Sequence, residues 1–282
     1  RIGIFSQCKF WIYAPVLIMK IFKSNLLIIL ASVIAGLAGW QSCDLPWQPG
    51  PMPDAIIETE FVPGLNILGI VRLEDTTASS FVYIERAYAS NEYETWVDSL
   101  PIIKNANVWI AGTRDTTGYI FRYYGEQSDH KYINTDFRPV AGETYQLTIT
   151  APDLPDLSAS TSVPHLPTID TGSVVISDGI VNFNLRTTAD AYLYDVYLLC
   201  ENGQLVNRLS NDGAIVKELQ FKLNNNLGAP LAIQVYGYDE NMATILNATS
   251  SIIPQSFLET LSTVEGGYGC FGAVSVLTYV LP

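Results

Sequence analysis

Short runs of alternating apolar and polar residues, separated by turn-forming residues, dominate this chain after residue 55. The runs lie at 57–61, 81–85, 107–110, 119–123, 144–150 and 157–163. A period of two places alternate side chains on opposite faces of a strand. Gly, Asn, Asp and Pro separate the runs, as expected for turns between strands. The pattern predicts a mainly all-β chain of antiparallel strands packed as β-sandwiches of the immunoglobulin-like kind.

The second half of the chain carries the clearest hairpin signals. Asp178-Gly179, Asn202-Gly203 and Asp212-Gly213 are each flanked by runs of strand-forming residues. These dipeptides tolerate the positive φ angles that tight hairpin turns require. Further strands are expected at 231–235 and 273–280, and one short helix is expected at 255–262, after Pro254.

Two prolines within the segment Val163-Pro-His-Leu-Pro167 interrupt the strand pattern. Proline cannot donate a ladder hydrogen bond and stiffens the chain around it. We therefore expect a domain boundary there, with one sandwich-like domain at 55–163 and a second at 168–282. Each is large enough to bury a core of its own.

The chain begins with Arg1, and its first methionine is Met19. Lys20 and Lys23 precede an uncharged apolar run of 15 residues, 26–40. A membrane span needs about 20 residues, so the shorter run is typical of a secretory signal peptide. We interpret 19–42 as that signal and expect residues 1–18 to be translated upstream sequence outside the protein.

Cys43 follows the apolar run directly and points to a lipoprotein signal. Ordinary signal peptidases prefer a small residue where Trp40 stands, whereas lipoprotein processing places a cysteine first in the mature chain. Acyl chains on its thiol would anchor the protein to a membrane. The alternative is an uncleaved signal anchor with Cys43 as an ordinary thiol. Residues 43–54 carry four prolines and predict a semi-stiff tether.

Composition narrows the classes of function. Charged residues make up 15% of the 282 residues, hydrophobic residues 48%, and the formal net charge is −13. This excludes a disordered chain and disfavours nucleic acid as a partner, because phosphate backbones require basic surfaces. Removal of residues 1–42 takes away four of the 15 basic residues and none of the 28 acidic ones, which leaves a net charge of −17.

Two cysteines remain in the expected globular part, Cys200 and Cys270. Export to an oxidising compartment would permit a disulfide between them. Cys200 ends an apolar run, where a buried free thiol is equally natural. Both interpretations stay open at this point.

Two motifs resemble catalytic or cofactor sites. Asp170-Thr-Gly-Ser173 matches the active-site turn of aspartic peptidases, but that chemistry needs a second carboxylate and the chain has no second copy. Gly267–Gly272 matches a dinucleotide-binding loop, but too few residues follow for the rest of that unit. We expect the start of a strand at the first and a glycine-rich turn at the second. His130 and His165 are expected on solvated loops, and neither a metal nor a cofactor is predicted.

A polar stretch at 88–100 contains Tyr93 and Trp96. Exposed aromatic rings can form a platform for a ligand. Packing at the edge of a core is the commoner use of such residues, and we favour it here.

Several segments together resemble a known family: Cys43, Lys104–Trp109, Gly118–Phe121, Gly142–Ile149, Val163–Asp170 and Glu265–Ala273. Over residues 43–282 the chain is similar to the Bacteroidota lipoproteins catalogued as domain of unknown function 4249. Members are usually encoded near TonB-dependent outer-membrane receptors, so the resemblance implies an accessory role at the cell envelope. It supplies no catalytic residues.

The leading hypothesis is a non-enzymatic binding or accessory module, lipid-anchored in the outer membrane, with a TonB-dependent receptor as its partner. One alternative is an envelope hydrolase acting on peptide or glycan, with Asp170 as its carboxylate. The other is a structural or adhesive surface module.

Overall fold

The computed structural model describes residues 62–282, apart from 75–78, 88–101, 115–117, 225 and 250–261. The lipidation candidate Cys43 and the aromatic pair Tyr93 and Trp96 lie outside the described residues. So do the predicted signal peptide, the tether, the run at 57–61 and nearly all of the predicted helix at 255–262.

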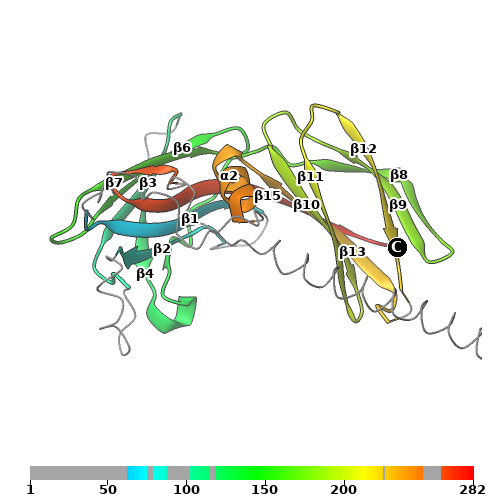
Figure 1. The fold of residues 1–282 in the computed structure, drawn as a ribbon, viewed down its shortest axis with the longest axis horizontal. Helices are drawn as coiled ribbons and strands as arrows, with labels where there is room; N and C mark the ends of the chain where they lie inside the picture. Colours follow the sequence, from blue (N-terminus) through cyan, green and yellow to red (C-terminus); the bar gives the residue numbers. More distant parts are fainter. Residues whose placement is uncertain (1–61, 75–78, 88–101, 115–117, 225, 250–261) are drawn as a thin grey trace, which may run out of the picture. The chain divides into compact units, whose positions relative to one another are not determined.

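The chain is all-β, as the alternation predicts (Figure 1). Its strands are β1 (Leu65–Leu73), β2 (Phe81–Arg86), β3 (Asn107–Gly112), β4 (Gly118–Tyr123), β5 (Tyr132–Ile133), β6 (Thr144–Thr150), β7 (Leu157–Ser162), β8 (Thr168–Ser177), β9 (Ile180–Arg186), β10 (Leu193–Cys200), β11 (Gly203–Ser210), β12 (Val216–Lys222), β13 (Pro230–Tyr238), β14 (Val264–Glu265) and β15 (Tyr268–Val280). The helical elements described are η2 (Gly125–Ser128) and α2 (Glu240–Thr249).

Two sheets pack in a sandwich-like arrangement. Twelve strands follow the order β11-β10-β13-β15-β1-β2-β5-β4-β3-β6-β7-β14, and three follow β12-β9-β8. The hairpin between β8 and β9 turns at Asp178-Gly179, where both residues have the positive φ that the dipeptide predicts. The hairpin between β10 and β11 turns one residue earlier than expected, because β11 already begins at Gly203. The hairpin expected at Asp212-Gly213 is wrong: this turn connects β11 to β12, which belong to different sheets and pair with β10 and β9.

The first of two hydrophobic cores lies between strands β15, β1 and β2 and strands β4, β3, β6 and β7. Its fully buried side chains include Leu65, Ile84, Ile110, Phe121 and Phe271. On β1, β2 and β3 buried positions alternate with more exposed ones, so the period-two pattern brings their side chains to one face. β15 instead is buried at every position from Cys270 to Val276.

The second core lies between β10, β13 and the end of β15 on one side and β9 and β12 on the other. Tyr194, Val196, Phe183 and Val235 are among its buried side chains. β15 therefore serves both cores: its first residues pair with β1, and its last residues pair with β13 (Figure 1).

β15 begins at Tyr268, five residues before the strand expected from the sequence, so the expectation of a glycine-rich turn through Gly272 is wrong. Gly269 has φ +105, and a side chain there would collide with the carbonyl oxygen of Ile67 on β1. At Gly272 a side chain would meet Met242 of α2. The glycines are needed for close approach of neighbouring elements within the strand.

α2 is a helix that the strand pattern did not predict. Asp239 precedes it as the N-cap, since its Oδ1 accepts a hydrogen bond from the backbone N–H of Met242 at 2.9 Å. Met242 and Ala243 are buried where the helix packs against β15. No helix within the described ranges has the length and hydropathy needed to cross a bilayer.

Candidate functional site

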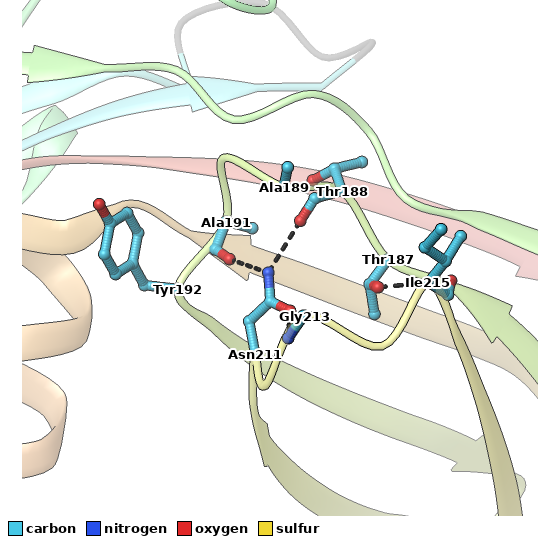
Figure 2. A pocket seen from close by; sticks show the side chains of 8 residues that line it. All are labelled: Thr187, Thr188, Ala189, Ala191, Tyr192, Asn211, Gly213 and Ile215. Carbon is cyan, nitrogen blue, oxygen red and sulfur yellow. Dashed lines mark hydrogen bonds between the residues drawn. The ribbon is translucent and has the colours of Figure 1, made fainter.

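A hollow of about 310 Å³ lies beside the connection from β9 to β10. We name it the threonine hollow, and Figure 2 shows the residues that line it: Thr187, Thr188, Ala189, Ala191, Tyr192, Asn211, Gly213 and Ile215. Its walls mix hydroxyl and amide groups with apolar side chains, as small-ligand sites commonly do.

Asn211 organises this hollow. Its Nδ2 donates to the carbonyl oxygens of Thr188, at 2.9 Å, and Ala191, at 2.6 Å, so one amide group holds both sides of the connection (Figure 2). From inside the second core, the buried hydroxyl of Tyr194 accepts the backbone N–H of Thr188 at 2.7 Å. The loop is therefore positioned by hydrogen bonds to its backbone before any ligand arrives.

A second hollow, of about 360 Å³, shares Ala189 and Tyr192 with the first. We name it the carboxylate hollow after three of its lining residues, and the full lining is Ser160, Thr161, Ser162, Ala189, Asp190, Tyr192, Asp239, Glu240 and Asn241. The two hollows meet at the shared residues, and together we refer to them as the groove.

Asp239 is the most buried of the three carboxylates, with 4% of its surface exposed. Besides capping α2, its carboxylate accepts the hydroxyl proton of the buried Thr161 on β7. Burial raises the pKa of the Asp239 carboxyl above its ordinary value, because ionisation is costly where water is excluded.

The pKa of the Asp190 carboxyl is shifted in the opposite direction. Its Oδ2 accepts from the backbone N–H of His165 at 2.9 Å and lies 2.6 Å from the Nδ1 of the same histidine. Burial raises the pKa of the Asp190 carboxyl, but the hydrogen bonds from His165 outweigh this effect and hold the pKa below its ordinary value. One hollow thus holds two carboxyl groups with pKa values moved in opposite directions.

Tyr192 stands between the hollows with 51% of its surface exposed. The negative charge of nearby Glu240 raises the pKa of its phenol. A half-exposed aromatic ring with carboxylates beside it offers a ligand one apolar face and several hydrogen-bond acceptors.

The charges along the groove restrict what it can take. Neither hollow has a lysine or arginine among its described lining residues. Three carboxylates with no lysine or arginine among them disfavour anionic ligands, so the groove suits an uncharged or cationic one. Within the described ranges, no cluster of three or more His, Cys, Asp or Glu is placed to hold a metal ion.

Comparison with known families identifies the chain. A family model described as a domain of unknown function, DUF4249, matches residues 72–226. The chain belongs to the DUF4249 family. No curated protein matches it.

The DUF4249 match runs from the last residues of β1 to the loop after β12. It contains the loop of the threonine hollow, with Asp190, Tyr192 and Asn211. It leaves out Asp239, Glu240 and the glycine-rich start of β15, which lies in one of the segments that carried the resemblance.

The peptidase-like motif lies in β8, where the register with β9 shifts between Asp170 and Val175. The Asp170 carboxylate accepts the backbone N–H of Gly172 at 3.2 Å, and the hydroxyl of Ser173 accepts the backbone N–H of Asn184 at 2.8 Å. The motif therefore forms a β-bulge whose polar side chains replace missing ladder hydrogen bonds.

The two cysteines of the globular part are free and buried. The disulfide allowed by the sequence does not form, because the two thiols belong to different surroundings. Cys200 packs in the second core, whereas the Sγ of Cys270 lies 3.8 Å from the Sδ of Met242 under α2.

The two histidines have defined partners. Nδ1 of His130 lies 2.7 Å from the hydroxyl of Tyr123, and His165 contacts Asp190 in the groove region. Both lie on loops, as predicted, with His165 exposed and His130 half-buried, and the sequence did not indicate either partner.

Asp190, Tyr192, Asn211 and Asp239 were not predicted as site residues. One signal was present for Asp239: an aspartate followed by a glutamate and then by Met242-Ala243 is a typical helix start. The others come from separate strands and loops, and nothing in their local sequence indicates that they meet.

Proposed function

We propose that this protein is a binding module of the bacterial cell envelope that takes its ligand in the groove. The observation that carries the proposal is the meeting of two hollows at the half-exposed ring of Tyr192, on a loop held by Asn211 and Tyr194. A preformed groove lowers the ordering cost of binding.

The test is capture of a partner from detergent-solubilised envelope on the immobilised full chain, because the proposed partner is a TonB-dependent receptor. Tyr192→Ala should lose the captured receptor. Tyr124→Ala, a similarly exposed tyrosine away from the groove, should keep it. Recovery of porins alone, or of the same proteins by both variants, would argue against the proposal.

The envelope location rests on Cys43 after the apolar run. Lipid on this cysteine would anchor the chain through several buried methylenes, each contributing about 0.8 kcal/mol. Labelling of cells with a fatty-acid analogue should mark the wild-type protein and leave Cys43→Ala unlabelled. Equal labelling of the wild type and Cys43→Ala would show that Cys43 is not the site of lipid attachment.

A second candidate, an envelope hydrolase, is favoured by the opposed pKa shifts of Asp190 and Asp239 in one hollow. Acid–base catalysis by paired carboxylates uses such a difference. Peptide and glycan substrates screened against the wild type, Asp190→Asn and Asp239→Asn would decide it. Asp170→Asn tests the carboxylate expected from the sequence, which lies in the β8 bulge and lines neither hollow. The same background from all four would exclude this candidate.

A further inference from the structure

The strands β3, β6 and β7 lie side by side in the twelve-stranded sheet and turn one face away from the first core (Figure 1). On that outer face the exposed residues include Trp109 of β3, Gln146 and Thr148 of β6, and Ser158 and Ser160 of β7. We name these five residues the tryptophan face. The strand register places Thr148 between Trp109 and Ser158, so the face is continuous across the three strands.

The indole of Trp109 rests on the neighbouring strand β4. A side chain on Gly118 would collide with three atoms of this ring, so the ring occupies the space that the glycine leaves empty. Trp109 nevertheless keeps 44% of its surface exposed. An aromatic ring that rests on a sheet and stays exposed offers a fixed apolar surface on which a ligand can stack.

A hollow of about 320 Å³ lies over β6 and β7, on the other side of β3 from the ring. Its lining includes the four polar residues of the tryptophan face, together with Thr263 and Glu265. The face therefore combines an apolar surface at one end with a polar depression at the other, as sites for small polar ligands do.

One row of residues across the sheet connects the ring with this hollow. The register aligns four residues in that row, Gly118, Ala111, Gln146 and Ser160. The indole covers Gly118, the last two residues line the hollow, and Ala111 between them carries only a methyl group. The row crosses three strand spacings, about 14 Å. This length suits an extended ligand of several units.

The side chains in the hollow suit a ligand with many hydroxyl groups. Gln146, Thr148 and Ser158 each carry both a hydrogen-bond donor and an acceptor. Within the described ranges no protein group engages these three side chains. They are therefore available to a ligand whose own groups both donate and accept.

Charge narrows the class of ligand further. No charged residue stands on β3, β6 or β7, whereas β12 alone carries Lys217, Glu218 and Lys222. A surface without charge disfavours nucleic acid and other ionic ligands, because these require charged partners. Serine and alanine are depleted in protein–protein interfaces, and their presence on this face disfavours a protein partner as well.

We propose that the tryptophan face binds an uncharged glycan, with one sugar ring stacked on Trp109 and the hydroxyl groups of the following units bonded to Gln146, Thr148 and Ser158. A sugar ring has an apolar face and a rim of hydroxyl groups, which matches the indole and the hollow. The proposal does not depend on the groove, with which this hollow shares Ser160.

The test is a glycan array probed with the full chain in a polyoxyethylene detergent, because maltoside or glucoside head groups would compete as sugars. Linear gluco-, manno-, galacto- and xylo-oligosaccharides are the neutral probes, and sulfated and sialylated glycans are the anionic ones. Neutral oligosaccharides should bind and anionic ones should not. An array on which no neutral oligosaccharide binds would overturn the proposal.

Variants then locate the site, with titration calorimetry of the oligosaccharide that binds best. Trp109→Ala should raise the dissociation constant about tenfold, because the stacking surface is lost, whereas Trp109→Phe should keep most of the affinity. Gln146→Ala should raise it about threefold to tenfold through loss of a hydrogen bond. Tyr124→Ala removes an aromatic side chain with the same 44% exposure and should bind like the wild type.

Gly118→Ala weakens the site without removing any group that contacts the ligand. Its added methyl group would displace the indole, so the affinity should fall as in Trp109→Ala. Circular dichroism should show that both variants are folded. Wild-type affinity in either variant, or equal losses in Trp109→Ala and Tyr124→Ala, would overturn the proposal.

Discussion

The two hydrophobic cores of this chain are built from similar side chains but are closed differently. The first lies within a run of strands that starts at β15 and returns to it, because β7 and β14 pack back against β15. The second lies between two separate groups of strands, so among the described strands edges remain at β8, β11 and β12. A sheet that closes on itself needs no edge protection, whereas an open sandwich does.

β15 contributes side chains to both hydrophobic cores. Phe271 fills the first core from this strand, and residues 277–281 reach the second. Damage to β15 should therefore affect both cores, while damage to a strand of one core should be felt there first.

The largest expected effect comes from Phe271→Ala. The side chain is fully buried, so its removal should lower the free energy of unfolding by about 3–5 kcal/mol. Hydrogen exchange should quicken in the strands of both cores. Phe183→Ala in β9 should cost a similar amount, with faster exchange mainly around the second core. Identical exchange patterns for Phe271→Ala and Phe183→Ala would show that β15 does not couple the two cores more strongly than β9 does.

Removal of a buried tyrosine hydroxyl from either core should lower the free energy of unfolding by a smaller amount. Tyr132 in the first core donates to the carbonyl oxygen of Ile103 at 2.8 Å, and Tyr194 in the second accepts from the backbone N–H of Thr188 at 2.7 Å. Tyr132→Phe and Tyr194→Phe should each cost about 1–3 kcal/mol in urea unfolding, because a backbone group loses its partner. Only Tyr194→Phe should also weaken binding in the groove. If Tyr132→Phe and Tyr194→Phe bind the ligand equally well, the hydroxyl of Tyr194 does not support the groove.

Asp239 connects β7 of the first core to α2. Asp239→Ala removes the cap of the helix and should cost about 1 kcal/mol, whereas Asp239→Asn keeps a capping oxygen. Burial raises the pKa of Asp239 in the folded chain, so its ionisation opposes folding. The wild type should lose stability relative to Asp239→Asn as the pH rises from below 3.8 through the folded-state pKa. A constant difference from pH 3 to 7 would contradict this.

Asp190 should show the opposite and smaller dependence. Its pKa is lowered in the folded chain, so its contribution to stability is present above 3.8 and is lost as the pH falls through the folded-state pKa. Asp190→Asn should cost a few tenths of a kcal/mol to about 1 kcal/mol, since the pair with His165 is partly exposed. Thermal unfolding of wild type and variant at pH 2 and pH 7 checks this. A larger loss at pH 2 would refute it.

The smallest effect is expected from reduction. Cys200 and Cys270 are free, and burial raises the pKa of the Cys270 thiol to about 11. Alkylation in denaturant without reductant should therefore modify both cysteines, and reductant should leave the unfolding transition unchanged. An unmodified pair would mean that the two cores are joined by a disulfide.

The sequence was sufficient where the structure is local. Alternation predicted β2, β3, β4, β6 and β7, and Asp178-Gly179 predicted the turn of the β8–β9 hairpin. Side-chain period and turn chemistry depend only on neighbouring residues, which explains why these elements could be predicted.

The sequence was insufficient where distant segments meet. β1 pairs in parallel with β15 across about 200 residues, and neither Gly269 nor Gly272 indicates from its own surroundings which element must approach it. The groove is of the same kind, because Thr161, Asp190 and Asp239 come from three distant places.

By itself the amino-acid sequence determined the all-β class and the turn of the β8–β9 hairpin, and it singled out Cys43 as the residue to test for an anchor. The tertiary structure alone decided the shared strand, the separation of the two thiols and the groove. These depend on which strand lies beside which, and that choice is made by the burial of many side chains at once rather than by any short stretch of the chain.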